Sequence, residues 1–132
     1  MNFLILLLLT TLTSFATAEQ TETDYLIEMM QENRAIHQSA VDRYWSVSYE
    51  VSIIQQIDLV IDFLSTNNTE HLDTISQFLT DAHQSHFDAL LWLGDNPLYA
   101  VWMGDADWQR KWIWVYADIL RKTSSYKCHS HP

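Results

Sequence analysis

Apolar residues recur every three or four positions along most of the chain, and this spacing predicts amphipathic helices. Neither glycine nor proline occurs from Glu19 to Leu93, so only short polar connections can separate the helices there. The first segment carries apolar residues at one set of helical positions and the second at another. The first set is Leu26, Met29, Met30, Ile36, Ala40 and Tyr44, and the second is Ile53, Ile54, Ile57, Ile61 and Leu64.

These two stripes do not share a face. In one helical frame of about 100° per residue they point about 120° apart, so a single straight helix would leave half of its stripe in water. We therefore predict a break near Trp45 to Ser48. A single long helix, gently supercoiled, is the alternative for residues 22–65.

A third helix follows the polar connection around Asn67, with Asn68 or Thr69 as its N-cap, and runs to Leu93. Its apolar face is Leu72, Ile75, Phe78, Leu79, Ala82, Ala89, Leu90 and Leu93. Gly94 fits the residue that closes this helix, and Asn96 and Pro97 fit the start of a single helical turn. Further along, Asp105 is expected to cap a fourth helix over residues 106–123, with an inner face of Trp108, Trp112, Val115, Tyr116 and Ile119.

Four such helices with mostly short connections predict an all-α fold, an up-down-up-down four-helix bundle. The alternative is one long bent N-terminal helix packed against two shorter helices. Residues 19–126 would form a single helical domain and residues 127–132 a flexible tail. The apolar residues between the two glycines are expected to cover one end of the bundle as a lid. They are Leu98, Tyr99, Val101, Trp102 and Met103.

The start of the chain has the features of a cleavable signal peptide. Phe3 to Leu9 carry no charge, and Ala16-Thr17-Ala18 supplies a small-x-small pattern before Glu19. No Lys or Arg precedes the apolar run, but that run is about half the length that a membrane span requires. We expect residues 1–18 to be removed and the protein to be secreted or periplasmic. An uncleaved leader is the one route to membrane attachment.

The charge is distributed unevenly and argues against nucleic acid as a partner. The formal net charge is −10, and residues 44–109 contain ten acids without a single Lys or Arg. Basic residues concentrate in the last helix, where residues 110–127 hold five bases and one acid. A nucleic-acid-binding surface needs a basic face, which is missing outside this helix.

Catalytic signatures are absent from the sequence. There is no Gly-rich phosphate loop, no His-Glu-x-x-His helix, no Gly-x-Ser-x-Gly elbow and no Glu-x-x-His pair. Cys128, the only cysteine, permits no intrachain disulfide. Together with His129 and His131 it could bind copper or zinc adventitiously. Because no catalytic motif is present, we expect no enzyme activity.

Ionisable residues on apolar faces form one candidate site. His37, Glu50, His83 and His86 fall within about one helical turn of a common level if the connections lie near residues 45 and 67. Imidazole nitrogens with one carboxylate suit divalent zinc, nickel or copper. These four residues therefore predict a transition-metal site. The alternative is a hydrogen-bonded polar layer that fixes the helix register.

Aromatic residues in the last third of the chain form the second candidate site. Trp114 points away from the inner face of the fourth helix and lies among Arg110, Lys111 and Arg121. Trp and Arg are enriched at binding hot spots, so this face, or the lid with Tyr99 and Trp102, suits a protein partner or a homodimer. Stacking of Trp114 under its own cations is equally consistent. The sequence thus predicts an exported acidic helical binding protein, with metal binding as the alternative.

Overall fold

A computed structural model shows that the described residues are mostly helical and form no strand. It describes the backbone of residues 2–44 and 47–130 and the side chains of residues 18–44 and 47–128. The α-helices are α1 (Asn2–Arg43), α2 (Ser48–Thr66), α3 (Leu72–Asp95), α4 (Ala100–Met103) and α5 (Ala106–Ser130), with a 3₁₀ turn, η1 (Pro97–Tyr99), before α4. The predicted all-α fold is confirmed.

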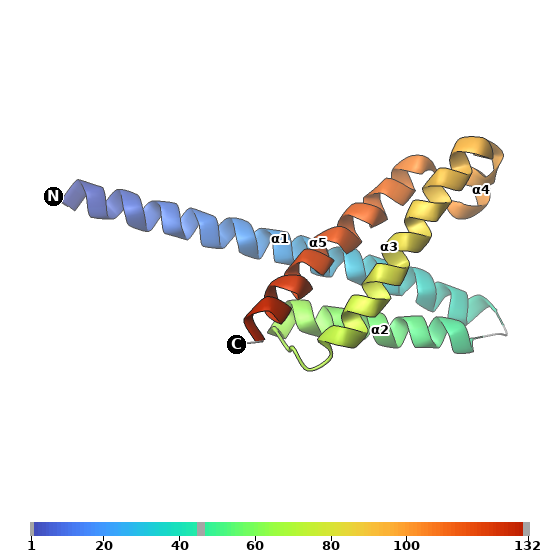
Figure 1. Ribbon diagram of the computed structural model, residues 1–132, viewed down its shortest axis with the longest axis horizontal. Helices are drawn as coiled ribbons and strands as arrows, with labels where there is room; N and C mark the ends of the chain where they lie inside the picture. The colour runs from blue at the N-terminus through green and yellow to red at the C-terminus, as the bar shows by residue number, and fades with distance from the viewer. Residues whose placement is uncertain (1, 45–46, 131–132) are drawn as a thin grey trace.

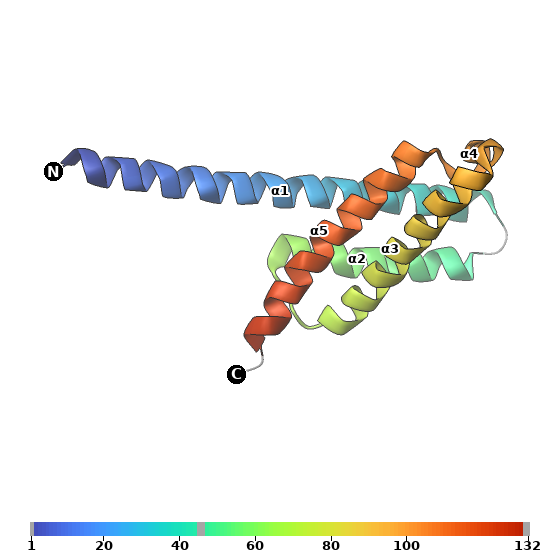
Figure 2. The same cartoon turned by 45° about the horizontal axis from the view of Figure 1, so that its top comes forward.

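The four long helices form two antiparallel pairs. α1 packs along α2 and α3 packs along α5, and the two pairs cross obliquely (Figures 1 and 2). The chain therefore runs up, down, up and down. The axes of α3 and α5 are, however, inclined to those of α1 and α2 and not aligned with them as in a regular bundle. The first part of α1, drawn in blue, extends away from the other helices (Figure 1).

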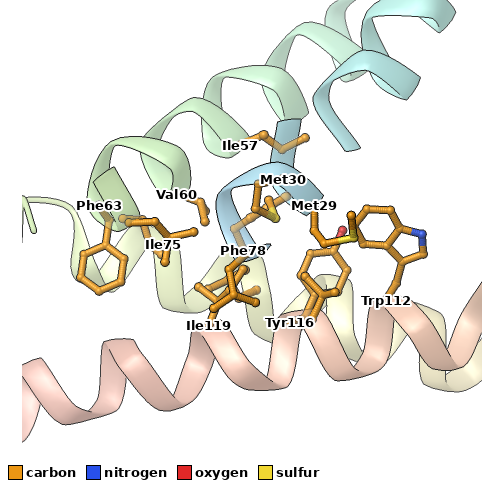
Figure 3. Packing of buried hydrophobic residues seen from close by; sticks show 14 of the residues in the cluster. Met29, Met30, Ile57, Val60, Phe63, Ile75, Phe78, Trp112, Tyr116 and Ile119 are labelled. Carbon is orange, nitrogen blue, oxygen red and sulfur yellow. The ribbon is translucent and has the colours of Figure 1, made fainter. Parts of the chain in front are cut away.

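The core lies where the pairs cross. Figure 3 shows side chains of α1, α2, α3 and α5 meeting there. Leu26, Met30, Ile57, Leu79 and Ile119 are completely shielded from solvent. Around them lie Met29, Val60, Phe63, Leu64, Leu72, Ile75, Phe78, Trp112, Val115 and Tyr116. Each long helix contributes part of the apolar face that its spacing predicts, and burial of these residues is the main stabilising term of the fold.

The predicted break between the first two helices is confirmed. α1 ends at Arg43 and α2 begins at Ser48, while Trp45 and Ser46 lie outside the described residues. At the far end of α2, Asn67 adopts a left-handed conformation with φ of 57°, and its N–H donates to the carbonyl of Phe63. This conformation ends the helix without a glycine, as asparagine sometimes does.

The boundaries of the third helix differ from the prediction. α3 begins at Leu72 and not after an N-cap at Asn68 or Thr69, because the Asn68 side chain accepts the Glu70 N–H and folds a local turn. Gly94 does not close the helix, which continues to Asp95. It stops at Asn96 because a residue before proline is disfavoured in the helical conformation.

The fourth long helix begins as predicted and ends later. The Asp105 carboxylate accepts the N–H of Trp108 at 2.8 Å, which confirms it as the cap of α5. Before it, Gly104 has a φ of +85°, and a Cβ atom there would collide with the Trp108 ring. α5 then continues to Ser130, beyond the expected end at residue 123 and into the segment expected to be a tail.

Two burial predictions are wrong. Ile36, on the predicted inner stripe of α1, is 43% exposed, and Tyr44 is also exposed. Of the residues expected to cover the bundle end as a lid, Leu98, Tyr99, Val101 and Trp102 are exposed too, and Met103 is partly buried. Both errors have one cause: crossed pairs cover each other only near the crossing, so their ends lack the neighbours of an aligned bundle.

Candidate functional site

The connection between α3 and α5 presents apolar side chains to solvent. Leu98 and Val101 are each 85% exposed and Trp102 is 82% exposed. Their spacing of three and four residues through η1 and α4 places them on one face of a two-turn helical segment. That face points away from the core. Monomeric proteins rarely group large apolar residues in this way unless the surface binds something.

Neighbouring residues widen this surface. Trp92 on α3 packs edge-to-face on Tyr99, with ring centroids 6.0 Å apart, and both remain half exposed. Leu91, the residue before Trp92 in α3, is also exposed. We refer to these residues together as the apolar tip: Leu91, Trp92, Leu98, Tyr99, Val101 and Trp102.

Gln109 holds the base of the apolar tip in place. Its side-chain nitrogen donates to the Met103 carbonyl at 2.5 Å, and its side-chain oxygen lies 2.6 Å from Nδ1 of His86. Because the Gln109 oxygen can only accept, His86 must carry its proton on Nδ1. Gln109 is 2% exposed. α3, α5 and the tip are therefore joined by one buried amide.

The sequence analysis missed Gln109, although a signal was present. Gln109 lies three residues before Trp112 and seven before Tyr116, and so falls on the inner face of α5. A polar residue on a buried stripe requires hydrogen-bond partners. Asn33 is a second example: it is buried on α1 and donates to the Tyr116 hydroxyl. Burial raises the pKa of Tyr116 to about 12, while the hydrogen bond from Asn33 opposes this rise.

His86 lies in an aromatic environment. Its ring centroid is 5.6 Å from that of Tyr116 and 6.4 Å from that of Trp112. Burial lowers the pKa of His86 below its ordinary value of 6.5. The hydrogen bond to Gln109 opposes this effect, and the charges of His37 and His83 lower the pKa further.

The four residues of the predicted metal site are only partly brought together. Nδ1 of His37 lies 2.5 Å from the Glu50 carboxylate, which links α1 to α2. The charges of His37 and His83 lower the pKa of His86, but the His86 ring hydrogen-bonds to Gln109. Within the residues whose side chains the structure describes, no group of three or more His, Cys, Asp or Glu is positioned to hold a metal ion. Cys128 is exposed, while the side chains of His129 and His131 lie outside the described residues.

The residues predicted to contact a partner fall into two groups. Tyr99 and Trp102 belong to the apolar tip. Trp114 is 65% exposed on the outer face of α5, and the cations near it are engaged: Arg110 pairs with Asp107 at 2.9 Å and Arg121 pairs with Asp118.

A cleft of about 690 Å³ opens elsewhere, between α1, α2 and α5. Its lining includes Phe63, Lys122 and Tyr126 and contains no residue of the apolar tip. The cleft therefore does not lie under the residues that were expected to form a lid.

Within the described residues no helix combines the length and the apolar content needed to cross a bilayer. The chain matches no protein-family model, no curated protein and no solved structure. Inferences about its function therefore depend on its own geometry.

Proposed function

We propose that the protein is a non-enzymatic binding protein that docks a protein partner through the apolar tip. The observation that carries this proposal is the outward face of η1 and α4, where Leu98, Val101 and Trp102 are each more than four-fifths exposed. A short amphipathic helix can bind an apolar groove by inserting apolar side chains spaced three or four residues apart. Full burial of one such side chain contributes roughly 1.5–3 kcal/mol.

The tip is also held firmly enough to serve as a ligand. Gln109 fixes the Met103 carbonyl, and Gly104 lets the chain turn tightly into α5. A surface fixed before binding loses less conformational entropy on docking than a floppy loop would. The buried amide and the exposed apolar face together thus support a docking function.

The test compares Trp102→Ser with Trp114→Ser, two exposed tryptophans on the two candidate surfaces. Partner capture from the native compartment should fall at least about tenfold for Trp102→Ser, the loss of a typical hot-spot side chain. It should stay near the wild-type level for Trp114→Ser. Thermal unfolding of both variants should match the wild type, which controls for misfolding. Loss of capture only with Trp114→Ser would assign binding to the α5 face and contradict the proposal.

Metal binding is the second candidate, and one observation favours it. Nδ1 of His37 faces the Glu50 carboxylate and Nδ1 of His86 faces the Gln109 oxygen. Because these oxygens act as acceptors, both rings donate from Nδ1. Metal-binding histidines are commonly oriented in this way, with the other nitrogen facing the ion. With His83 nearby, zinc, nickel or copper are the candidate ions.

Adding zinc or nickel to metal-free protein tests this candidate. Binding to the folded state should raise the melting temperature by several degrees, on the order expected when ligand greatly exceeds its Kd. His86→Ala should abolish the rise. If no divalent transition metal changes the melting temperature of the wild type, the metal hypothesis is wrong.

Export is the third part of the proposal. The first part of α1 extends away from the other helices (Figure 1), so its removal would leave the packed core unchanged. Protein recovered from the secreted or periplasmic fraction should begin at Glu19 on N-terminal sequencing. Recovery of the chain with residues 1–18 still attached would contradict cleavage.

A further inference from the structure

We infer that the partner of the apolar tip is a different protein, whose apolar groove is bordered by Lys or Arg side chains. This inference rests on the proposed docking function and adds the chemistry of the partner. It follows from the charges around the tip and from the way the cations of this chain are already used.

The tip is flanked by acids. Asp95 ends α3 just before the tip and Asp105 caps α5 just after it, and both are exposed. Asp107 follows within the first turn of α5. The nearest cation in the sequence, Arg110, is paired with Asp107. A groove that accepts the tip therefore brings its own border close to the carboxylates of Asp95 and Asp105, and a basic border is electrostatically complementary to them.

A second copy of the chain fits this description poorly. The chain has seven Lys and Arg residues, and most of them are paired internally. Arg34 pairs with Asp58, Arg110 with Asp107, Lys111 with Glu32, Arg121 with Asp118 and Lys127 with Asp73. With a net charge of −10 on each copy, two copies also repel one another at long range.

Anionic lipid is disfavoured by the same charges. Exposed Trp, Leu and Val side chains are compatible with a membrane interface, but proteins that bind anionic membranes place Lys or Arg beside their apolar residues. Here the flanking positions are Asp95 and Asp105. The shape of the tip, a two-turn segment with anchors at Leu98, Val101 and Trp102, is better suited to a groove than to a flat bilayer.

The test uses the full chain with a photo-reactive phenylalanine derivative in place of Val101, expressed in its native cells. Irradiation should give an adduct with one other protein, cross-linked at a site that has Lys or Arg nearby. When the irradiation is repeated on an extract of those cells, the adduct yield should fall as sodium chloride rises from about 50 to 500 mM, because added salt screens charges at the rim.

Charge variants provide the matched control. Asp95→Asn with Asp105→Asn removes two charges at the tip while keeping a residue that can cap α5. The adduct yield should drop roughly two- to fivefold, the effect of one or two exposed charge pairs. Glu28→Gln with Asp81→Asn removes two exposed charges elsewhere and should leave the yield unchanged.

The outcomes separate this inference from the proposed function. If a protein adduct forms and its yield depends neither on salt nor on Asp95 and Asp105, the inference of a basic border on the partner is wrong, while docking through the tip is supported. An adduct with a second copy of the chain or with lipid would overturn the inferred partner. Absence of any adduct at Val101 would overturn docking through the tip itself.

Discussion

His86 lies in an environment that is apolar on the faces of its ring and polar at one of its nitrogens. Its ring faces Tyr116 and Trp112, while Nδ1 needs the Gln109 oxygen. The neutral ring satisfies both demands, since it has an apolar face and a single donor. A protonated ring would place a charge among aromatic side chains and close to His37 and His83.

The pKa of His86 gives a prediction for acid conditions. The folded-state pKa is lowered from 6.5, so below that value the unfolded chain binds a proton more readily than the folded protein does. The contribution of neutral His86 to the free energy of unfolding should be fully present above the pKa that His86 has in the unfolded chain. It should be lost as the pH falls through the lower pKa of the folded protein. Urea unfolding between pH 7.5 and pH 5 should show this decline.

The groups facing His86 determine the control for this measurement. His37, His83 and, through His37, Glu50 also lie near this region. His86→Gln should flatten the decline while those groups remain, and His71→Gln controls for the loss of an imidazole elsewhere. An undiminished pH dependence in His86→Gln would show that another group is responsible.

At the level of single residues, the sequence predicted part of this polar layer. Helical phase and level placed His37 near Glu50, and these two side chains are hydrogen-bonded. The same reasoning could not show that His86 would turn to Gln109, because that contact depends on how α5 lies against α3. Three-dimensional packing, and not the sequence spacing of the histidines, decides which partner each ring finds.

At the level of helices, α1 shows how one apolar stripe can have two environments. Leu26, Met29 and Met30 are buried in the core cluster together with residues of α3 and α5, whereas Ile36 and Tyr44 on the same stripe are exposed. The periodicity correctly predicted the helix and the face. The periodicity could not predict how far along α1 the stripe is buried by other helices.

This difference along α1 can be measured by truncating side chains. Met30→Ala should lower the free energy of unfolding by about 2–5 kcal/mol, the usual cost of a cavity at a fully buried site. Ile36→Ala should cost under about 1 kcal/mol, because much of that side chain is already in water. Denaturant titration of both variants checks the prediction. Equal losses would mean that the stripe is covered along its whole length.

At the level of the whole molecule, helix number, order and chain reversal were predictable, whereas the angle between the pairs was not. Short connections at residues 44–47 and 67–71 make neighbouring helices antiparallel. The crossing of one pair over the other depends on how ridges of side chains interlock, which amphipathic spacing does not encode. Because the angle was not predictable, Leu98, Tyr99, Val101 and Trp102 were expected to pack over the end of an aligned bundle, and their exposure corrects that prediction.

The single cysteine gives this arrangement a practical use. Cys128 is exposed near the end of α5, and the helix starts beside the apolar tip at Ala106. At 1.5 Å per residue, roughly 33 Å of helix separates Cys128 from Ala106. A maleimide linker at this thiol would tether the molecule to a sensor chip by the end of α5 remote from the tip, leaving Trp102 and its neighbours facing the flowing solution.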